Sequence, residues 1–433
     1  MITFVILGGT GDLTKRKLLP AIYGLIEEKK ISKFSVVLCA RHKVNVKDIL
    51  HVSRKYIINR KRDVWHKLEK NTAYQQLDFY KDDDYISLKE KLKYFEKKKS
   101  TRIFYLATLP QHFDTISENI AKYKLAPRDS RVVYEKPFGT DLKSARKLNK
   151  CVNRVFNEKQ IYRIDHYLGK ELVSNISLMR FTNRILEPLW CGNHVKSVHI
   201  HLREKIGVEG RGNFYDKYGA LKDVVQNHCL QLLALTAMEA PKLLVGEYVR
   251  DQKAIVLKNT RVKKVILGQY QGYKNEPGVD KKSKTETYAK LELAVNTLRW
   301  RGVPFIITAG KALSQKEVNV DIHFKHTKCL LSKSCPVDTN YFKIRIQPES
   351  GFELGLHSKV PGEGSKLAPV KMNFCQSSEF GLNTPDAYQN LLLDVIKGDQ
   401  SVFVRNDEIE YAWKIIDKVK RGKLIYYKKG WQG

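Results

Sequence analysis

The fold is decided by a stretch near the amino terminus that reads ITFVIL at residues 2–7 and continues as GGTGDL at residues 8–13. The first six residues form a short, mostly apolar run of the kind found in a buried strand. Glycines then punctuate the chain, and apolar residues recur at helical spacing through Leu18, Ile22 and Leu25. The sequence therefore predicts a strand, a tight turn and a helix.

Further apolar runs follow this unit in the first half of the chain. They cover residues 34–40, 102–108 and 131–134 and alternate with helical patterns. Strands that alternate with helices indicate a parallel, doubly wound sheet. We therefore expect an α/β Rossmann-type dinucleotide-binding domain at residues 1–165.

The second half of the chain has a different periodicity. Residues 198–202, 291–295, 318–322 and 342–346 alternate apolar with less apolar side chains. A period of two is typical of strands that bury one face, as in a large antiparallel sheet. We expect an α+β domain with a large, mainly antiparallel sheet at residues 166–433.

Length and composition are those of a folded protein with more than one core. The chain has 433 residues, of which 42% are apolar and 29% charged, and this length favours two domains. No apolar run is long enough to cross a membrane and no secretory leader is recognisable, so we expect a cytoplasmic protein. The seven cysteines include no C-x-x-C pair, which indicates reduced thiols and no zinc site.

The chain is strongly basic. Lysine and arginine together number 78, against 46 aspartates and glutamates, which gives a formal net charge of +32. Such a charge suits nucleic-acid binding or the capture of anionic substrates, but it also suits a lysine-rich surface. The densest basic runs lie apart, at 89–99, 281–284 and 420–428, and no nucleic-acid-binding motif accompanies them. We expect a basic surface without a nucleic-acid partner.

The glycine turn at residues 8–13 is a candidate dinucleotide site. Glycines between a first strand and a first helix let the backbone approach a pyrophosphate, which the N–H groups of the helix then bind. The strict G-x-G-x-x-G pattern fails, because Thr14 stands where the third glycine would fall. The motif alone therefore also fits an ordinary strand-to-helix turn.

The end of the second expected strand gives another indication of the cofactor. Domains that bind NAD usually place a carboxylate there, against the 2′-hydroxyl of the ribose. This chain instead has Arg41, His42 and Lys43. Cations at this position suit the additional 2′-phosphate of NADP, although a solvated basic loop would look the same.

Residues 160–171 contain a candidate phosphate site. A strand-like run leads into Asp165, a suitable N-cap, and a helical pattern follows. On such a helix His166 and Lys170 would share a face near the amino terminus, where a phosphate dianion binds well. Two exposed polar residues would give the same spacing.

Another candidate site lies on the helical pattern at residues 219–233. His228 falls on its apolar stripe, where a histidine is either a satisfied core residue or a general base. Asp223 precedes it by five residues, about 140 degrees around an α-helix, and is therefore poorly placed as its partner. As a base, His228 needs a carboxylate from another segment.

Four segments together resemble the glucose-6-phosphate dehydrogenase family. They read GGTGDLTKRK at 8–17, EKPFG at 135–139, RIDHYLGKE at 163–171 and AGKAL at 309–313. The third looks like the signature of that family, whereas the EKP element also occurs in other sugar oxidoreductases with Rossmann domains. The segments follow the family's order along most of the chain.

The resemblance implies oxidation of D-glucose 6-phosphate to 6-phospho-D-glucono-1,5-lactone with hydride transfer from C1 to NADP+, the first step of the oxidative pentose phosphate pathway. His228 would be the general base for the C1 hydroxyl, and Asp165 its carboxylate partner. The residues implied in substrate binding are Lys136, His166, Tyr167, Lys170, Glu204, Asp223, Lys311 and Lys316. Those implied in cofactor binding are Gly8, Gly9, Thr10, Gly11, Asp12, Leu13, Thr14, Lys15, Arg41 and Lys136.

The resemblance also implies a homodimer, formed through the large sheet of the second domain. Some relatives hold a second, structural NADP, but Glu317 and Asp321 stand where those relatives have basic residues. Two carboxylates would repel its phosphates, so we expect this second site to be absent. The chief alternative is a Rossmann oxidoreductase of an unphosphorylated sugar, against which the pair of His166 and Lys170 argues.

Overall fold

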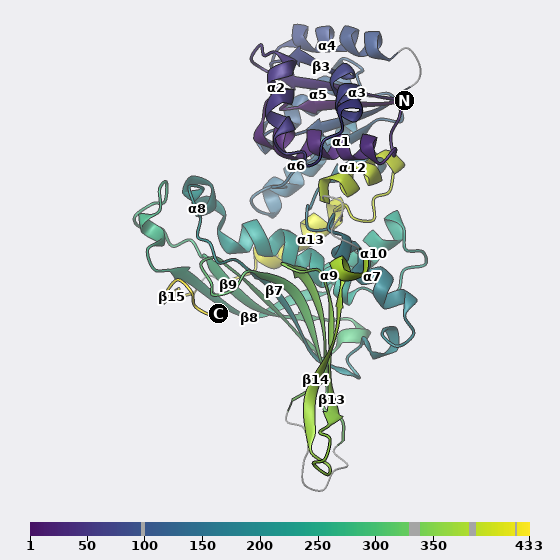
Figure 1. Cartoon of the computed structure of the whole chain (residues 1–433). Coiled ribbons are helices and arrows are strands. Elements are labelled where there is room, and N and C mark those ends of the chain that lie inside the picture. The colour runs from purple at the N-terminus through teal and green to yellow at the C-terminus, as the bar shows by residue number, and fades with distance from the viewer. Residues whose placement is uncertain (97–99, 329–337, 381–386, 421) are drawn as a thin grey trace. The chain divides into compact units, whose positions relative to one another are not determined.

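The computed structural model describes the chain except for residues 97–99, 329–337, 381–386 and 421 (Figure 1). By packing, the chain divides into two compact units. The first comprises residues 1–170, 245–247 and 385–410, and the second comprises 171–244, 248–384 and 411–433. The domain boundary expected between residues 165 and 166 stays a prediction. In terms of packing, the chain passes between the two units several times.

The first unit contains a sheet with strand order β3-β2-β1-β4-β5-β6, in which all pairs are parallel. The strands are β1 (Ile2–Leu7), β2 (Phe34–Ala40), β3 (Thr72–Gln76), β4 (Thr101–Leu106), β5 (Arg131–Tyr134) and β6 (Ile161–Arg163). The prediction of a Rossmann-type sheet is confirmed. The runs at 2–7, 34–40 and 131–134 are strands over the residues expected from their apolar patterns.

The carboxyl ends of these strands lie side by side. Leu7 pairs with Cys39 and with Leu106, and Tyr134 pairs with Leu106 and with Arg163. The segments that follow these residues therefore leave the sheet along one edge. Open α/β sheets bind their ligands at this edge.

Helices of the first unit pack against the sheet and against one another. They are η1 (Thr14–Leu18), α1 (Leu19–Glu27), α2 (Val46–Arg54), α3 (Arg62–Lys70), α4 (Asp82–Phe95), α5 (Phe113–Lys122), α6 (Leu142–Val155) and α12 (Ala387–Lys397), and α13 (Asn406–Ile416) begins there. Helix α1 contacts α3 and α12, whereas α5 contacts α4 and α6. The late helix α12 is thus part of the first unit, because Leu391, Leu392 and Val395 are buried in the same apolar cluster as Ile22 and Leu25 of α1.

The second unit is built on a sheet that the described residues form from nine strands, in the order β14-β13-β12-β11-β7-β10-β9-β8-β15. The strands are β7 (Val195–Arg203), β8 (Thr260–Tyr270), β9 (Tyr288–Val295), β10 (Pro304–Gly310), β11 (Glu317–Phe324), β12 (Tyr341–Gln347), β13 (Gly351–Lys359), β14 (Leu367–Cys375) and β15 (Ile425–Tyr427). The pairs β7 with β10 and β8 with β15 are parallel and the others are antiparallel. The predicted large, mainly antiparallel sheet is confirmed.

Alternation of side chains explains why these segments are strands. In β7, Val198, Ile200 and Leu202 are buried, and the residues between them are partly exposed. The helices of this unit are α7 (Glu171–Thr182), α8 (Gly212–Ala220), η5 (Leu221–Cys229), α9 (Leu230–Ala237), α10 (Gly246–Lys258) and α11 (Gln376–Phe380). Helix η5 contacts β7 and β10, and α7 contacts β12, so these helices lie against the sheet.

Two sequence expectations concern cysteines and membranes. Five cysteines are free thiols, namely Cys39, Cys151, Cys191, Cys229 and Cys375. Cys329 and Cys335 lie outside the described residues. Within the part of the chain that the structure describes, no helix combines the length and apolarity needed to cross a bilayer.

Candidate active site

The glycine turn closes against the ends of neighbouring strands. The N–H groups of Gly8 and Gly9 each donate to the carbonyl oxygen of Cys39 at 2.9 Å, and Thr14 Oγ1 donates to the carbonyl oxygen of Gly8 at 3.0 Å. Gly8 has a φ of +99°, and a Cβ there would lie 2.2 Å from the carbonyl oxygen of Ala107. The turn therefore requires a residue without a side chain at this position.

A helical segment follows the turn at once and includes the π-helical η1. Thr10, Gly11 and Lys15 are partly exposed, and Asp12 is exposed and forms an ion pair with Arg16 at 3.1 Å. Local π-helical geometry is frequent at functional sites. Residues 8–15, which were predicted to bind the cofactor, thus form one strand-to-helix turn, whose helix N-terminus fits a pyrophosphate.

The end of β2 lies beside this turn, because Leu7 and Cys39 pair in the sheet. Arg41, His42 and Lys43 follow β2, and all three are exposed. The carbonyl oxygen of Arg41 accepts a hydrogen bond from Gln76 Nε2 at 3.1 Å, which fixes the backbone while the guanidinium stays in solvent. This cationic strand end fits a phosphate group.

The signature segment forms a turn where a helix was expected. The expectation that His166 and Lys170 share the face of a helix is wrong, because α7 begins only at Glu171. The Asp165 side chain accepts the N–H of Tyr167 at 2.9 Å, and the Asp165 carbonyl oxygen accepts the N–H of Leu168 at 2.9 Å. An aspartate can close such a turn with the same acceptor that would cap a helix.

Aromatic contacts order this turn. The Lys170 ammonium lies 4.2 Å from the centroid of the Tyr167 ring, and the His166 and Tyr167 rings lie 4.8 Å apart. Asp165 is 3% exposed, whereas His166, Tyr167 and Lys170 are partly exposed. The turn therefore gathers two basic side chains and a hydroxyl on a short loop, an arrangement that can bind a phosphate without a helix.

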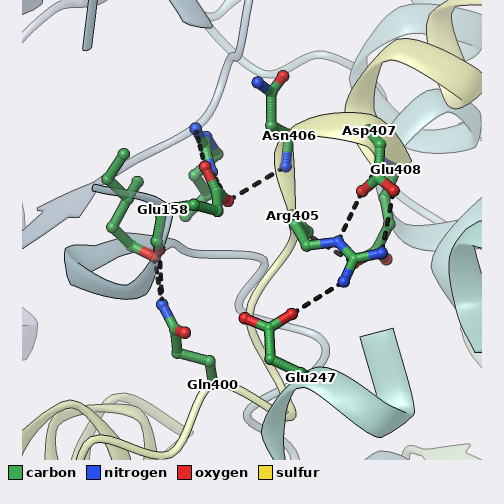
Figure 2. A network of polar contacts seen from close by, with 9 residues as sticks. Glu158, Glu247, Gln400, Arg405, Asn406, Asp407 and Glu408 are labelled. Carbon is green, nitrogen blue, oxygen red and sulfur yellow. Dashed lines mark hydrogen bonds and ion pairs between the residues drawn. The ribbon is translucent and has the colours of Figure 1, made fainter. Parts of the chain in front are cut away.

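A polar network supports the strand that leads into the turn (Figure 2). Arg163 is 3% exposed, and its guanidinium donates to both carboxylate oxygens of Glu158, at 2.6 and 3.2 Å. Gln400 Nε2 donates to the carbonyl oxygens of Glu158 and Ile161, at 3.0 and 2.8 Å, and the N–H of Val404 donates to the carbonyl oxygen of Arg163 at 3.1 Å. Residues 400–404 thereby cover the free edge of β6.

The network continues beyond residue 404. Arg405 donates to Glu247 at 2.8 Å and to Asp407 at 2.8 and 3.0 Å, and the N–H of Asn406 donates to Glu158 at 3.3 Å. No signal in the sequence connects these distant segments. They nevertheless hold the backbone two residues ahead of Asp165.

In the second unit, His228 lies on a π-helix. It is 3% exposed and belongs to η5, which follows a break at Gly219, where φ is +64°. A Cβ at Gly219 would lie 2.5 Å from Glu286 Oε1, and the same carboxylate oxygen accepts the N–H of Leu221 at 3.2 Å. The glycine therefore permits the close approach that starts the π-helix.

This geometry corrects the argument made from α-helical spacing. In a π-helix the hydrogen bonds run from residue i to i+5, so residues five apart lie about one turn from each other. Asp223 and His228 have this separation within η5. The expected angle of an α-helix does not apply, and it gives no reason to reject Asp223 as a neighbour of His228.

Two of the predicted substrate residues are ion-paired with each other. Lys311 Nζ contacts Glu204 Oε2, and both residues are partly buried. The strand ends fix this pair, because the N–H of Glu204 donates to the carbonyl oxygen of Gly310 at 2.9 Å. Lys316 lies just before β11 and is exposed. A ligand that bound Glu204 through hydroxyl groups would compete with the Lys311 ammonium.

Tyr215 belongs to this region but was missed by the sequence argument. It is 2% exposed, and the Lys311 ammonium lies 5.4 Å from its ring centroid. Burial, followed by the charges of Asp223, Glu286 and other neighbours, raises the pKa of its hydroxyl far above the usual value. That hydroxyl has no hydrogen-bond partner among the described residues. A lone tyrosine in a helical pattern carries no sequence signal for such a position.

Comparison with known proteins identifies the family of this chain. Residues 5–175 match the family model described as glucose-6-phosphate dehydrogenase, NAD binding domain, and residues 177–433 match the model for the C-terminal domain of the same enzyme. The chain belongs to the glucose-6-phosphate dehydrogenase family. The resemblance seen in the four sequence segments is thereby confirmed.

Individual members of the glucose-6-phosphate dehydrogenase family are similar in sequence to this protein over nearly its whole length. The glucose-6-phosphate 1-dehydrogenase of Chlamydia pneumoniae is 39% identical, over 96% of this chain and 88% of its own length. The cytoplasmic glucose-6-phosphate 1-dehydrogenase 5 of Arabidopsis thaliana is 36% identical, over 100% of this chain and 89% of its own length. The similarity therefore covers both units.

Solved structures of glucose-6-phosphate dehydrogenases have the same fold. One, in complex with its substrate glucose-6-phosphate, matches with a TM-score of 0.94 and 31% identity, over 100% of this chain and 95% of that one. The structure of the Mycobacterium avium enzyme matches with a TM-score of 0.89 and 35% sequence identity, over 100% of this chain and 94% of that one. A levoglucosan dehydrogenase reaches 0.52 at 10% identity, which shows a shared fold alone. The alternative of an enzyme for an unphosphorylated sugar receives no support from these values.

Proposed function

We propose that this chain oxidises D-glucose 6-phosphate at C1 to 6-phospho-D-glucono-1,5-lactone, with NADP+ as the hydride acceptor. The observation that carries the proposal is the turn at residues 165–170, which follows the last strand of a dinucleotide-binding sheet and carries the family's signature. A family match over both units supports the same reaction. The role in the oxidative pentose phosphate pathway follows from this reaction.

We carry over the roles of individual residues from the family resemblance. His228 takes the proton of the C1 hydroxyl, and Asp165 orients the imidazole and stabilises the imidazolium. His166, Tyr167 and Lys170 bind the 6-phosphate. The remaining substrate contacts are assigned to Lys136, Glu204, Asp223, Lys311 and Lys316. A positioned base of this kind contributes roughly 10² to 10⁴ in rate.

The base assignment has a direct test with a matched control. Reduction of NADP+ is followed at 340 nm with glucose 6-phosphate as the substrate. We expect His228→Asn to lose nearly all activity while its circular dichroism stays that of the wild type. His201→Gln removes another largely buried histidine of the same unit and should keep most of the activity. Wild-type activity in His228→Asn would exclude this histidine as the base.

NADP is the preferred cofactor in this proposal, bound by the glycine turn and by Arg41. When bound, NADP+ accepts the hydride released from C1. Exposed cations after β2, without a carboxylate there, support the choice of NADP over NAD. Arg41→Ala should raise the KM for NADP+ and leave that for NAD+ nearly unchanged, with Lys29→Ala as the control for loss of a surface charge. An unaltered preference for NADP+ would remove Arg41 from this role.

The proposed enzyme is a cytoplasmic homodimer that associates through the large sheet of the second unit. On β7 and β11 that sheet carries polar and charged side chains, of which His199 and His323 are partly buried and Asp321 is buried. We propose that a second copy pairs with this face of the sheet. Sedimentation at micromolar concentration tests this, and a monomeric mass would exclude the dimer.

A further inference from the structure

The EKP element contains a carboxylate to which the family resemblance gave no role. Glu135 directly follows Tyr134, the last residue of β5. Tyr134 pairs with Arg163 of β6, and the N–H of Ile164 donates to the carbonyl oxygen of Tyr134 at 2.9 Å. The segments that follow β5 and β6 therefore run side by side past the ends of these strands. This places Glu135 next to the segment that contains Asp165.

Two tyrosines hold the Glu135 carboxylate. The hydroxyl of Tyr105, on β4, donates to Glu135 Oε1 at 2.5 Å. The hydroxyl of Tyr388, on α12, also forms a hydrogen bond with the Glu135 side chain. Tyr105 is 1% exposed, so its hydroxyl has little access to water. The clamp therefore fixes the side chain of the residue that precedes Lys136.

Four charged or titratable groups face this carboxylate. They are Tyr105 on β4, Tyr388 on α12, Lys136 on the following loop and Asp165 after β6. The pKa of Glu135 is raised to about 6, chiefly by burial and to a smaller extent by the charge of Asp165, although the two hydroxyls and Lys136 act to lower it. Glu135 is thus ionised at neutral pH. Because Coulomb interactions are mutual, the charge of Glu135 also acts on Asp165 and on Lys136, repelling the first and attracting the second.

We propose that Glu135 is a positioning residue for the sugar oxidation, an inference that rests on the proposed function. Its carboxylate, clamped by Tyr105 and Tyr388, fixes the backbone that presents Lys136 and places a second negative charge beside Asp165. A second carboxylate there strengthens the field that favours protonation of the base. Glu135 therefore acts through Asp165 and Lys136 without touching the reacting atoms.

A purely structural role makes a different prediction. If Glu135 served only to attach α12 to the sheet through Tyr388, loss of its charge would lower stability and leave the chemistry unchanged. The pH dependence of kcat/KM separates the two roles, because it reports the pKa of the base in the free enzyme. Thermal unfolding of the same samples measures the structural part.

The test compares Glu135→Gln with the wild-type chain. Glutamine keeps an oxygen that accepts from a tyrosine hydroxyl, but it lacks the charge. Removal of a negative charge should lower the pKa of the base, so the acid limb of kcat/KM moves to lower pH by roughly one unit. A base weakened to this extent should also lose about threefold in plateau rate.

A second pair of variants keeps the proposal testable if Glu135→Gln folds poorly. Tyr105→Phe removes one donor but retains the carboxylate, and should move the acid limb the same way by a smaller amount. Tyr85→Phe is its control, because Tyr85 is buried in the same unit and donates instead to the carbonyl oxygen of Phe79 at 3.2 Å. That variant should keep the wild-type profile.

The outcomes separate this inference from the proposed function. A wild-type chain that fails to oxidise glucose 6-phosphate excludes the proposed function itself. If the wild type is active and Glu135→Gln has the same acid limb and plateau in its pH profile of kcat/KM, the positioning role alone is overturned. A shifted limb in both Glu135→Gln and Tyr105→Phe, with Tyr85→Phe unchanged, supports it.

Discussion

The guanidinium of Arg163 and the carboxylate of Glu158 form a bidentate ion pair, with N–O distances of 2.6 and 3.2 Å. The arginine is 3% exposed, so loss of its partner would leave a buried charge without compensation. The pair lies at the end of β6, two residues before Asp165. Its strength therefore bears on both stability and the position of the signature turn.

Glu158→Gln should lower the free energy of unfolding by about 3 kcal/mol, because the buried guanidinium loses its counter-charge. Urea unfolding followed by tryptophan fluorescence measures the change. The control is Glu410→Gln, which breaks the exposed ion pair with Arg146 and should cost less than about 1 kcal/mol. Equal losses of unfolding free energy in the two variants would show that the buried ion pair stabilises the protein no more than the exposed one does.

Tyr215→Phe should leave stability unchanged or raise it by about 1 kcal/mol, since the hydroxyl that it removes is buried without a hydrogen-bond partner among the described residues. Tyr273→Phe is the matched control. The Tyr273 hydroxyl donates to Asp216 at 2.9 Å, so its removal should destabilise the chain. Differential scanning calorimetry distinguishes the two, and a lower Tm for Tyr215→Phe would indicate that the hydroxyl is bonded in solution.

The free energy of unfolding should fall as the pH is lowered from about 6.5 to 4. Burial lowers the pKa of His199 to about 4 and that of His201 to about 3. The unfolded chain therefore binds more protons than the folded chain in this window, and stability is lost as the pH falls. We expect a loss on the order of 1–2 kcal/mol per histidine between pH 7.5 and 5.

Urea unfolding at several pH values tests this slope. His201→Gln should flatten it, because the variant removes one of the two partly buried imidazoles. A glutamine in place of the exposed His194 should leave the slope as in the wild type. Identical slopes in all three proteins would assign the acid sensitivity to other groups.

Gly8→Ala should abolish cofactor binding or unfold the first unit. Its φ is +99°, and a Cβ would lie 2.2 Å from a backbone oxygen, so the turn has to move. Gly272→Ala separates strain from collision, because Gly272 has a φ of +90° but open space around its Cβ position. It should cost about 1 kcal/mol and leave binding of NADP+ intact, as measured by titration calorimetry.

Local pattern was sufficient to predict the strands. The runs at 2–7, 34–40 and 131–134 are strands over those residues, because β-branched and aromatic side chains there are buried on both faces. The helix expected after Asp165 was wrong for an equally local reason. An aspartate that accepts an N–H two residues later looks the same in sequence whether a turn or a helix follows.

The π-helix at His228 could not be predicted from the sequence. Its residues have ordinary helical propensities, and the cause lies in Glu286, which is distant in sequence and occupies the space beside Gly219. The ion pair of Lys311 with Glu204 depends in the same way on strand pairing. Contacts between distant segments decide the geometry of a site, whereas sequence patterns indicate only which residue types are present.

The return of residues 385–410 to the first unit bears on how the protein is synthesised. Leu391, Leu392, Val395 and Phe403 complete an apolar cluster whose other buried residues come from the first half of the chain. At about 5–20 residues per second, a ribosome adds α12 on the order of ten seconds or more after β6. During that interval the nascent first unit exposes the apolar surface that α12 later covers. The unit whose synthesis starts first can therefore complete its core only when most of the chain has been made.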